Sequence, residues 1–181
     1  MRILAWNYRG LARPAARRML WELVESHKSD ILFLCEIKIA HTDKLSYLLQ
    51  SSNLIYSALV PAFNKAGGLC LAWTPSLNVN IVLTNSWRIN ALFFLNSKPR
   101  PWQFTGVHYP AVPTLKPDFW HCFNKICSSF DGPWLATGDF NASQNAFGDE
   151  LNFVTSLTWD LLALSLHSQT KGQEWLISNL D

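Results

Sequence analysis

The sequence predicts one globular domain of the mixed α/β class. Apolar runs that end in polar residues, such as 1–6 and 31–35, are typical of buried strands. Between these two runs, apolar residues recur at helical spacing after Pro14. The chain has 181 residues, is 49% hydrophobic and contains 9 Trp and 11 Phe, which is enough to fill a core. We therefore expect a single domain over residues 1–181.

Helices are expected at three places. Pro14 sets the start of the first, which continues through Val24. Thr42 is a candidate N-cap for the second, and apolar residues at 45–49 follow it. The third follows Pro117, with its apolar residues on one face. This order places one helix after each of the first two strands and one late in the chain.

Runs separated by Pro, Asn and Gly predict further strands in the middle of the chain. These strands are expected at 55–60, 68–73, 79–84, 91–95 and 102–107. Five of the nine prolines lie between Pro99 and Pro117, which is also typical of a linker. The strand pattern inside that segment favours one continuous domain with stiff loops instead.

Polar side chains follow three of the apolar runs, at the carboxyl end of each expected strand. Asn7 ends the first run, and Glu36 follows the second. Asp139 and Asn141 follow the run 134–137, with Gly138 between. Each of these is also a common turn former, so each alone carries little weight. Together they form a constellation where α/β sheets place ligands, and their carboxylate and amide oxygens suit a divalent cation or a phosphate.

Five motifs in this order resemble the endonuclease/exonuclease/phosphatase superfamily, and most closely the endonuclease domain of plant non-LTR (LINE-type) retrotransposons. The motifs are Trp6-Asn7-Tyr8-Arg9-Gly10-Leu11, Phe33-Leu34-Cys35-Glu36-Ile37-Lys38, Gly67-Gly68-Leu69-Cys70-Leu71-Ala72-Trp73, Phe104-Thr105-Gly106-Val107-His108 and Gly138-Asp139-Phe140-Asn141. The resemblance covers almost the whole chain. It implies a four-layer α/β sandwich, in which two facing mixed sheets have helices outside.

The resemblance also implies a role for each site residue. Glu36 would be the main ligand of Mg²⁺, assisted by Asn7, and Mn²⁺ is the alternative ion. Asp139 would orient or deprotonate the attacking water, and Asn141 would bond the scissile phosphate. No small-molecule cofactor is expected.

The chain departs from the superfamily at two positions near the expected site. Thr usually follows the metal-binding Glu, and this chain has Ile37 there. The family's active-site Tyr, which follows the strand at 102–107, is replaced by His108, with Tyr109 next. Either His108 takes the role of that Tyr, since imidazole also bonds phosphate, or Tyr109 does.

The largest departure is at the C-terminus. Residues 174–181 resemble the family's penultimate strand, where Asp181 would help to position the catalytic groups. The family continues to a final strand and a Ser-Asp-His ending, so we expect a sandwich that is incomplete at the C-terminus and lacks its final strand. A general base typically contributes about 10²–10⁴ in rate, so loss of the final His would lower activity.

Three functions follow as expectations. The first is an Mg²⁺-dependent endonuclease that nicks DNA, in a chain that acts as a monomer and was once fused to a reverse transcriptase. The second is a catalytically dead, truncated remnant, and the third is a phosphatase or exonuclease of the same superfamily, because the catalytic core is shared. A DNA substrate implies the nucleus. The four cysteines fit no zinc or disulfide pattern and no apolar run spans a bilayer, so an intracellular protein without membrane attachment is expected.

Overall fold

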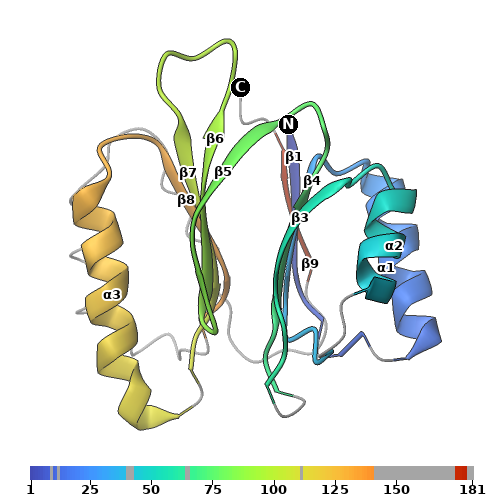
Figure 1. Ribbon diagram of the computed structural model, residues 1–181, viewed down its shortest axis with the longest axis horizontal. Helices are drawn as coiled ribbons and strands as arrows, with labels where there is room; N and C mark the ends of the chain where they lie inside the picture. Colours follow the sequence, from blue (N-terminus) through green and yellow to red (C-terminus); the bar gives the residue numbers. More distant parts are fainter. Residues whose placement is uncertain are drawn as a thin grey trace.

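Two β-sheets face each other in the middle of the molecule, and helices cover the outer face of each (Figure 1). The computed structural model describes residues 1–8, 10–11, 13–39, 43–63, 66–110, 112–140 and 174–178. Over these residues the expected four-layer α/β sandwich is confirmed. The single domain over 1–181 and the missing final strand stay predictions.

The first sheet has five strands in the order β3-β4-β2-β1-β9. Their bounds are β1 (Arg2–Asn7), β2 (Ile31–Cys35), β3 (Tyr56–Val60), β4 (Leu69–Trp73) and β9 (Glu174–Ser178). Strands β1 and β2 are parallel and are joined through helix α1 (Pro14–His27), while β2–β4, β3–β4 and β1–β9 are antiparallel. Helix α2 (Asp43–Ser51) lies beside α1 on the outer face of this sheet (Figure 1).

The second sheet has four strands in the order β5-β6-β7-β8. Their bounds are β5 (Asn78–Asn85), β6 (Arg88–Phe94), β7 (Trp102–His108) and β8 (Trp134–Asp139). Strands β7 and β8 are parallel, and the chain between them forms the short 3₁₀ turn η1 (Pro113–Leu115) and helix α3 (Lys116–Ser129). Each sheet therefore contains one parallel pair whose two strands are connected through a helix.

The expected helices and strands lie close to the observed ones, and the differences have local causes. Helix α3 begins at Lys116, so Pro117 occupies the first turn, where its missing N–H is not needed. Strand β6 begins at Arg88, before the expected start at 91, because its polar residues are buried rather than exposed. Asn90 is one of these, and its side-chain oxygen accepts a hydrogen bond from the Thr105 hydroxyl at 3.0 Å.

Three apolar clusters hold the four layers together. The central cluster draws residues from both sheets, including Phe33, Phe93 and Phe104. A second cluster joins the first sheet to α1 and α2, and a third joins the second sheet to α3. Strand β2 has a packed layer on each of its faces, so all five of its residues are buried and apolar. The continuous apolar runs of the sequence therefore mark the middle of the sandwich.

The sheets are in tight contact where Phe33 on β2 meets Gly106 on β7. A Cβ atom at Gly106 would lie 2.2 Å from Cε2 of Phe33, so only glycine leaves room for this ring. The ring of Phe33 also contacts that of Phe104 edge to face, with their centroids 5.7 Å apart. This contact sets the spacing between the two sheets just below their site end.

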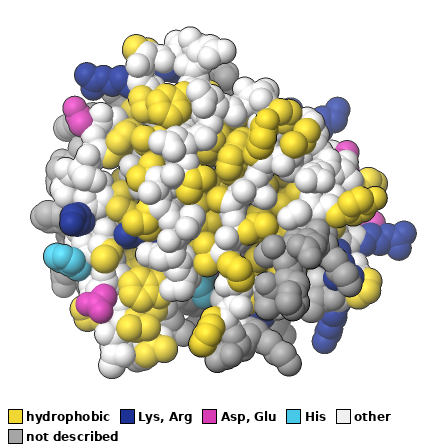
Figure 2. Space-filling model, viewed as in Figure 1, with side chains coloured by type: hydrophobic (Ala, Val, Ile, Leu, Met, Phe, Trp, Pro, Cys, Tyr) yellow, Lys and Arg dark blue, Asp and Glu magenta, His cyan; other side chains and the backbone are white. Residues whose placement is uncertain are grey.

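The edge strands β3 and β5 contact each other and are much more exposed than their neighbours. Hydrophobic side chains gather on this face of the molecule (Figure 2). Tyr56, Val82 and Leu83 are among the exposed apolar residues on these two strands. Tyr56 stacks on Trp73 of β4, with ring centroids 6.2 Å apart. No helix in the described part of the chain is long and apolar enough to cross a membrane.

Replacing Gly106 with Ala is expected to destabilise the protein by about 1–3 kcal/mol, because the new methyl group overlaps the Phe33 ring. Urea unfolding measures this loss. Phe33→Leu should recover part of it in the double variant, giving a favourable coupling energy in a double-mutant cycle. Strictly additive effects of the two substitutions would contradict the contact.

Candidate active site

Four strand ends meet at one end of the paired sheets. Asn7 is the last residue of β1, and Glu36 directly follows β2. His108 and Asp139 are the last residues of β7 and β8. Each pair of strands is parallel, so the ends of a pair lie at one edge, and β1 and β2 both contact β8 across the sandwich. The topology thus brings together side chains that are 132 residues apart in the chain.

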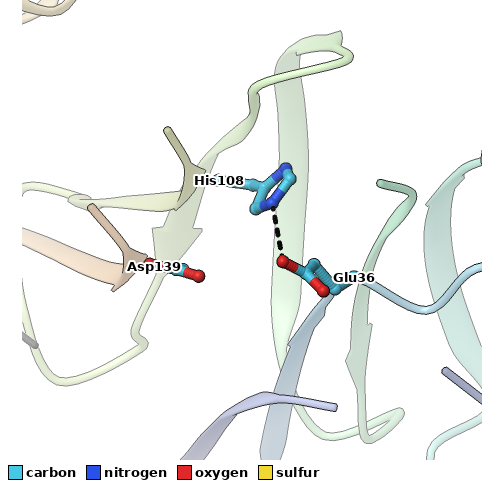
Figure 3. A group of neighbouring side chains, drawn as sticks. All are labelled: Glu36, His108 and Asp139. Atoms are coloured by element: carbon cyan, nitrogen blue, oxygen red, sulfur yellow. Dashed lines mark ion pairs between the residues drawn. The ribbon is translucent and has the colours of Figure 1, made fainter. Parts of the chain in front are cut away.

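Glu36, His108 and Asp139 form a cluster between the two sheets (Figure 3). One ligand atom from each lies within 4.8 Å of the others. His108 and Asp139 are register partners on neighbouring parallel strands, so their side chains leave the same face of the sheet. Nε2 of His108 lies 3.5 Å from Oε1 of Glu36, which comes from the opposite sheet.

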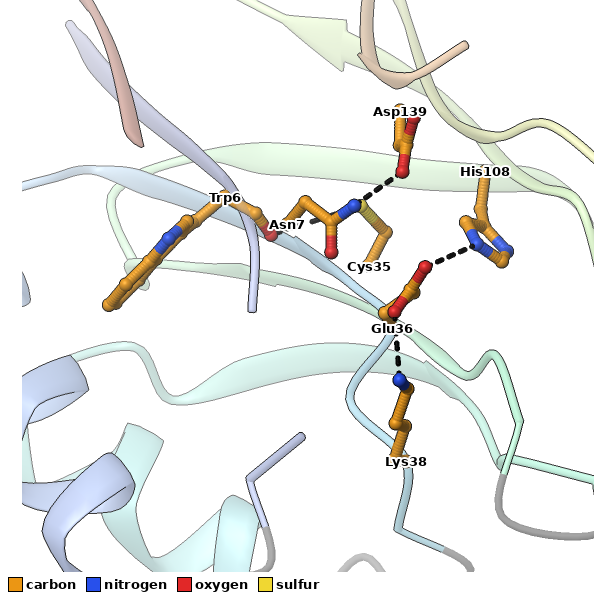
Figure 4. Close-up of polar contacts among 7 residues, drawn as sticks. All are labelled: Trp6, Asn7, Cys35, Glu36, Lys38, His108 and Asp139. Carbon is orange, nitrogen blue, oxygen red and sulfur yellow. Dashed lines mark hydrogen bonds and ion pairs between the residues drawn. The ribbon is translucent and has the colours of Figure 1, made fainter. Parts of the chain in front are cut away.

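Asn7 completes the group from the first sheet. Its Nδ2 donates a short hydrogen bond to Oδ2 of Asp139, which is a second link between the sheets (Figure 4). Its Oδ1 is buried and has no hydrogen-bond partner among the described residues. A buried carbonyl oxygen without a partner is costly unless a ligand satisfies it. This orphaned oxygen beside two carboxylates fits a divalent cation.

The backbone after β2 turns sharply and holds Glu36 in place. Glu36 and Lys38 both adopt left-handed backbone conformations, with φ of 55° and 54°. Lys38 N–H donates to the Gly67 carbonyl at 3.0 Å, which ties this turn to the start of β4. Ile37 lies between them and is fully buried in the cluster below α1 and α2. Ile37, which replaces the Thr expected from the resemblance, therefore packs in the core in this chain.

The ammonium group of Lys38 forms an ion pair with the other oxygen of Glu36. Nζ of Lys38 lies 3.0 Å from Oε2, on the side away from His108 (Figure 4). Sequence reasoning gave Lys38 no role, although it lies within one of the five motifs. The sequence signal that could have indicated this contact is the position of Lys38, two residues after Glu36. In the structure both residues have left-handed backbone conformations, and their side chains meet.

The surroundings of the site shift the pKa values of two groups in opposite directions. The imidazole of His108 is the largest cause that lowers the pKa of Glu36, from 4.5 to about 2, and Lys38 adds to this while partial burial opposes it. Burial, and then the charge of Asp139, raises the pKa of the Cys35 thiol well above its usual value. Glu36 is therefore a carboxylate at neutral pH, whereas Cys35 stays a neutral thiol beneath the site.

Of the remaining predicted site residues, the structure describes Tyr109 and places it away from this cluster. Tyr109 is buried under α3, where its hydroxyl accepts a hydrogen bond from Nε1 of Trp120 at 3.1 Å. The structure therefore brings His108 to Glu36 and Asp139, and does not bring Tyr109 there. Asn141 and Asp181 lie outside the described residues.

Comparison with known families matches this arrangement to one of them. The profile described as the endonuclease/exonuclease/phosphatase family matches residues 4–159, which is most of the chain. The chain belongs to this family. The resemblance inferred from the five motifs is thereby confirmed at the level of the superfamily, whose members are nucleases and phosphatases. No curated protein sequence matches the chain significantly.

Solved structures of family members share the fold at low sequence identity. The catalytic domain of human nocturnin with bound sulfate has a TM-score of 0.58 and 17% identity, over 84% of this chain and 71% of that one. A 3′-5′ exonuclease (NExo) from Neisseria meningitidis has a TM-score of 0.62 and 14% identity, over 87% and 71%. The catalytic domain of Xenopus laevis APE2 has a TM-score of 0.56 and 18% identity, over 79% and 59%.

The lowered pKa of Glu36 predicts how stability changes with acid. Because its folded pKa lies below the usual 4.5, ionised Glu36 stabilises the protein above pH 4.5, and this contribution is lost as the pH falls toward about 2. In chelator, wild type should be more stable than Glu36→Gln at neutral pH, and the difference should shrink over that range. Urea unfolding at several pH values measures it.

Glu22→Gln is the matched control for this measurement. Glu22 forms an exposed ion pair with Arg18 on α1, 3.4 Å apart, and such surface pairs contribute little. The free energy of unfolding of Glu22→Gln should differ little from that of wild type over the whole pH range. A difference between wild type and Glu36→Gln that does not change with pH would contradict the ion pairing of Glu36.

Proposed function

We propose that the chain hydrolyses phosphodiester bonds of DNA as a divalent-cation-dependent endonuclease that nicks one strand. The observation that carries this proposal is the convergence of two carboxylates, an amide and an imidazole at the site end of the sandwich. Membership of the family supports hydrolysis of phosphate esters, and the site supplies groups for each part of that reaction.

The cation would be held by Glu36 and Asn7. Oε1 of Glu36 and the partnerless Oδ1 of Asn7 are the oxygens that fit this role, and hard divalent cations prefer such ligands. The proposed ion is Mg²⁺, with Mn²⁺ as the alternative. When bound, it would neutralise charge on the scissile phosphate and stabilise the leaving oxygen.

Asp139 is the group that would orient and deprotonate the attacking water. The hydrogen bond from Asn7 holds Oδ2 of Asp139, so the carboxylate is oriented at the site. No proton is needed on Asp139 for this bond, because Asn7 is the donor. Asn141, two residues further on, keeps its proposed role as a phosphate ligand, and Asp181 keeps its role as a positioning residue.

Origin and cellular context are part of the same proposal. The motifs at 6–11 and 67–73 support descent from the endonuclease domain of a plant non-LTR retrotransposon. A chain of that origin would act as a monomer on nuclear DNA, and a reverse transcriptase would once have been fused to it.

The test is nicking of supercoiled plasmid by the purified chain in the presence of Mg²⁺ or Mn²⁺. Wild type should convert the plasmid to open circles, and chelator should stop the reaction. Glu36→Ala and Asp139→Ala should each lower the rate by about 10²–10⁴, because they remove the main ligand and the base. Glu22→Ala, on the exposed face of α1, is the control and should keep the wild-type rate.

Other substrates in the same assay separate the remaining functions. Shortening of end-labelled linear DNA without nicking would replace the endonuclease with an exonuclease, the activity named for the Neisseria meningitidis relative. Release of phosphate from small esters alone would indicate a phosphatase. A folded chain that cleaves none of these substrates with either cation would be a catalytically dead remnant.

A further inference from the structure

We propose that His108 is a direct nitrogen ligand of the cation, so that the site selects first-row transition metals such as Mn²⁺ and Co²⁺ over Mg²⁺. This inference rests on the proposed function for the presence of a cation, and it places Mn²⁺, the alternative ion there, before Mg²⁺. The inference concerns His108, which stands where the family resemblance places a Tyr.

The spacing of His108 and Glu36 fits two ligands of one ion. A charge-assisted hydrogen bond between nitrogen and oxygen is usually about 2.7–2.9 Å long. The ion pair of Lys38 and Glu36, at 3.0 Å, is close to this length. Nε2 of His108 lies further from Oε1 of Glu36, at 3.5 Å. Two ligand atoms that are each about 2.1 Å from one ion lie roughly 3.0–3.4 Å apart at octahedral or tetrahedral angles.

The two oxygens of Glu36 are divided between two partners. Oε2 is held by Lys38, and Oε1 faces His108 on the inner side of the site (Figure 4). Lys38 therefore orients the carboxylate and leaves Oε1 as its ligand oxygen. A second-sphere contact of this kind is common around protein metal sites.

The ring of His108 is also held in position. Its backbone N–H donates to the Trp87 carbonyl at 2.8 Å, and its side chain is only 16% exposed. Gly67 is near the other side of the ring, where an added Cβ atom would come into ordinary contact at 3.9 Å from Nδ1. With Nδ1 on that side, Nε2 is the nitrogen that faces Glu36 (Figure 3).

The resulting donor set has oxygens from Asn7 and Glu36 and one imidazole nitrogen from His108. Mg²⁺ favours oxygen ligands alone and loses its waters reluctantly, whereas imidazole is a good ligand for first-row transition metals. Replacing one oxygen ligand with a nitrogen therefore shifts the preference toward Mn²⁺ and Co²⁺. The carboxylate of Glu36 and the amide oxygen of Asn7 keep the site within the range of hard ligands that Mn²⁺ accepts.

Pulsed electron paramagnetic resonance of the Mn²⁺-loaded protein tests the ligand directly. Wild type should show ¹⁴N coupling from a bound imidazole. His108→Gln should lose this coupling, and His121→Gln should keep it, since His121 is exposed on α3. Circular dichroism of both variants checks that they are folded. Bound Mn²⁺ without nitrogen coupling in the wild type would overturn the inference, whatever the variants do.

Titration calorimetry measures the preference. Wild type should bind Mn²⁺ at least about tenfold more tightly than Mg²⁺. His108→Gln should weaken Mn²⁺ binding by about 10–100-fold and leave Mg²⁺ binding nearly unchanged. Equal weakening of both ions would mean that His108 acts only as an ion-pair partner of Glu36 or as a phosphate contact. If wild type binds neither ion, the proposed function fails too. If wild type binds Mg²⁺ and Mn²⁺ but its Mn²⁺ form shows no nitrogen coupling, this inference alone is overturned.

Discussion

The distance between the two sheets governs both the core and the site of this protein. It is set where the ring of Phe33 occupies the space that a side chain at Gly106 would need. Glu36 lies three residues beyond Phe33, and His108 lies two beyond Gly106. Because both strands continue rigidly from that contact, the spacing of the core becomes the spacing of the site. A glycine in the middle of β7 is therefore needed for the geometry of the proposed site as well as for packing.

The site also shows how a local strain is offset. Left-handed conformations at Glu36 and Lys38 are unfavourable for side chains that carry a Cβ atom. The burial of Ile37 and the hydrogen bond from Lys38 to Gly67 stabilise this turn. Glu36 is thereby aimed at the opposite sheet instead of toward solvent, and Lys38 balances part of the negative charge that gathers there.

Much of the architecture was predictable because the ends of buried strands can be recognised in the sequence, where an apolar run gives way to polar residues. The run before Glu36 is apolar throughout and those before Asn7 and Asp139 are mostly so, a pattern typical of strands that are covered on both faces. The choice between His108 and Tyr109 was not predictable, since it depends on which face of β7 each side chain leaves. Lys38 was missed for a similar reason: its contact with Glu36 arises from backbone conformations that the residue types do not favour. The roles of the site residues remain proposals.

The four inward-facing groups are divided equally between the sheets, with Asn7 and Glu36 on one and His108 and Asp139 on the other. Neither sheet alone presents a complete set of ligands. An ion bound by this set would contribute its free energy only after the sheets have docked. Its effect should therefore fall on the rate of unfolding more than on the rate of folding, provided that docking follows the transition state. The cation would then act mainly by slowing the separation of the two sheets.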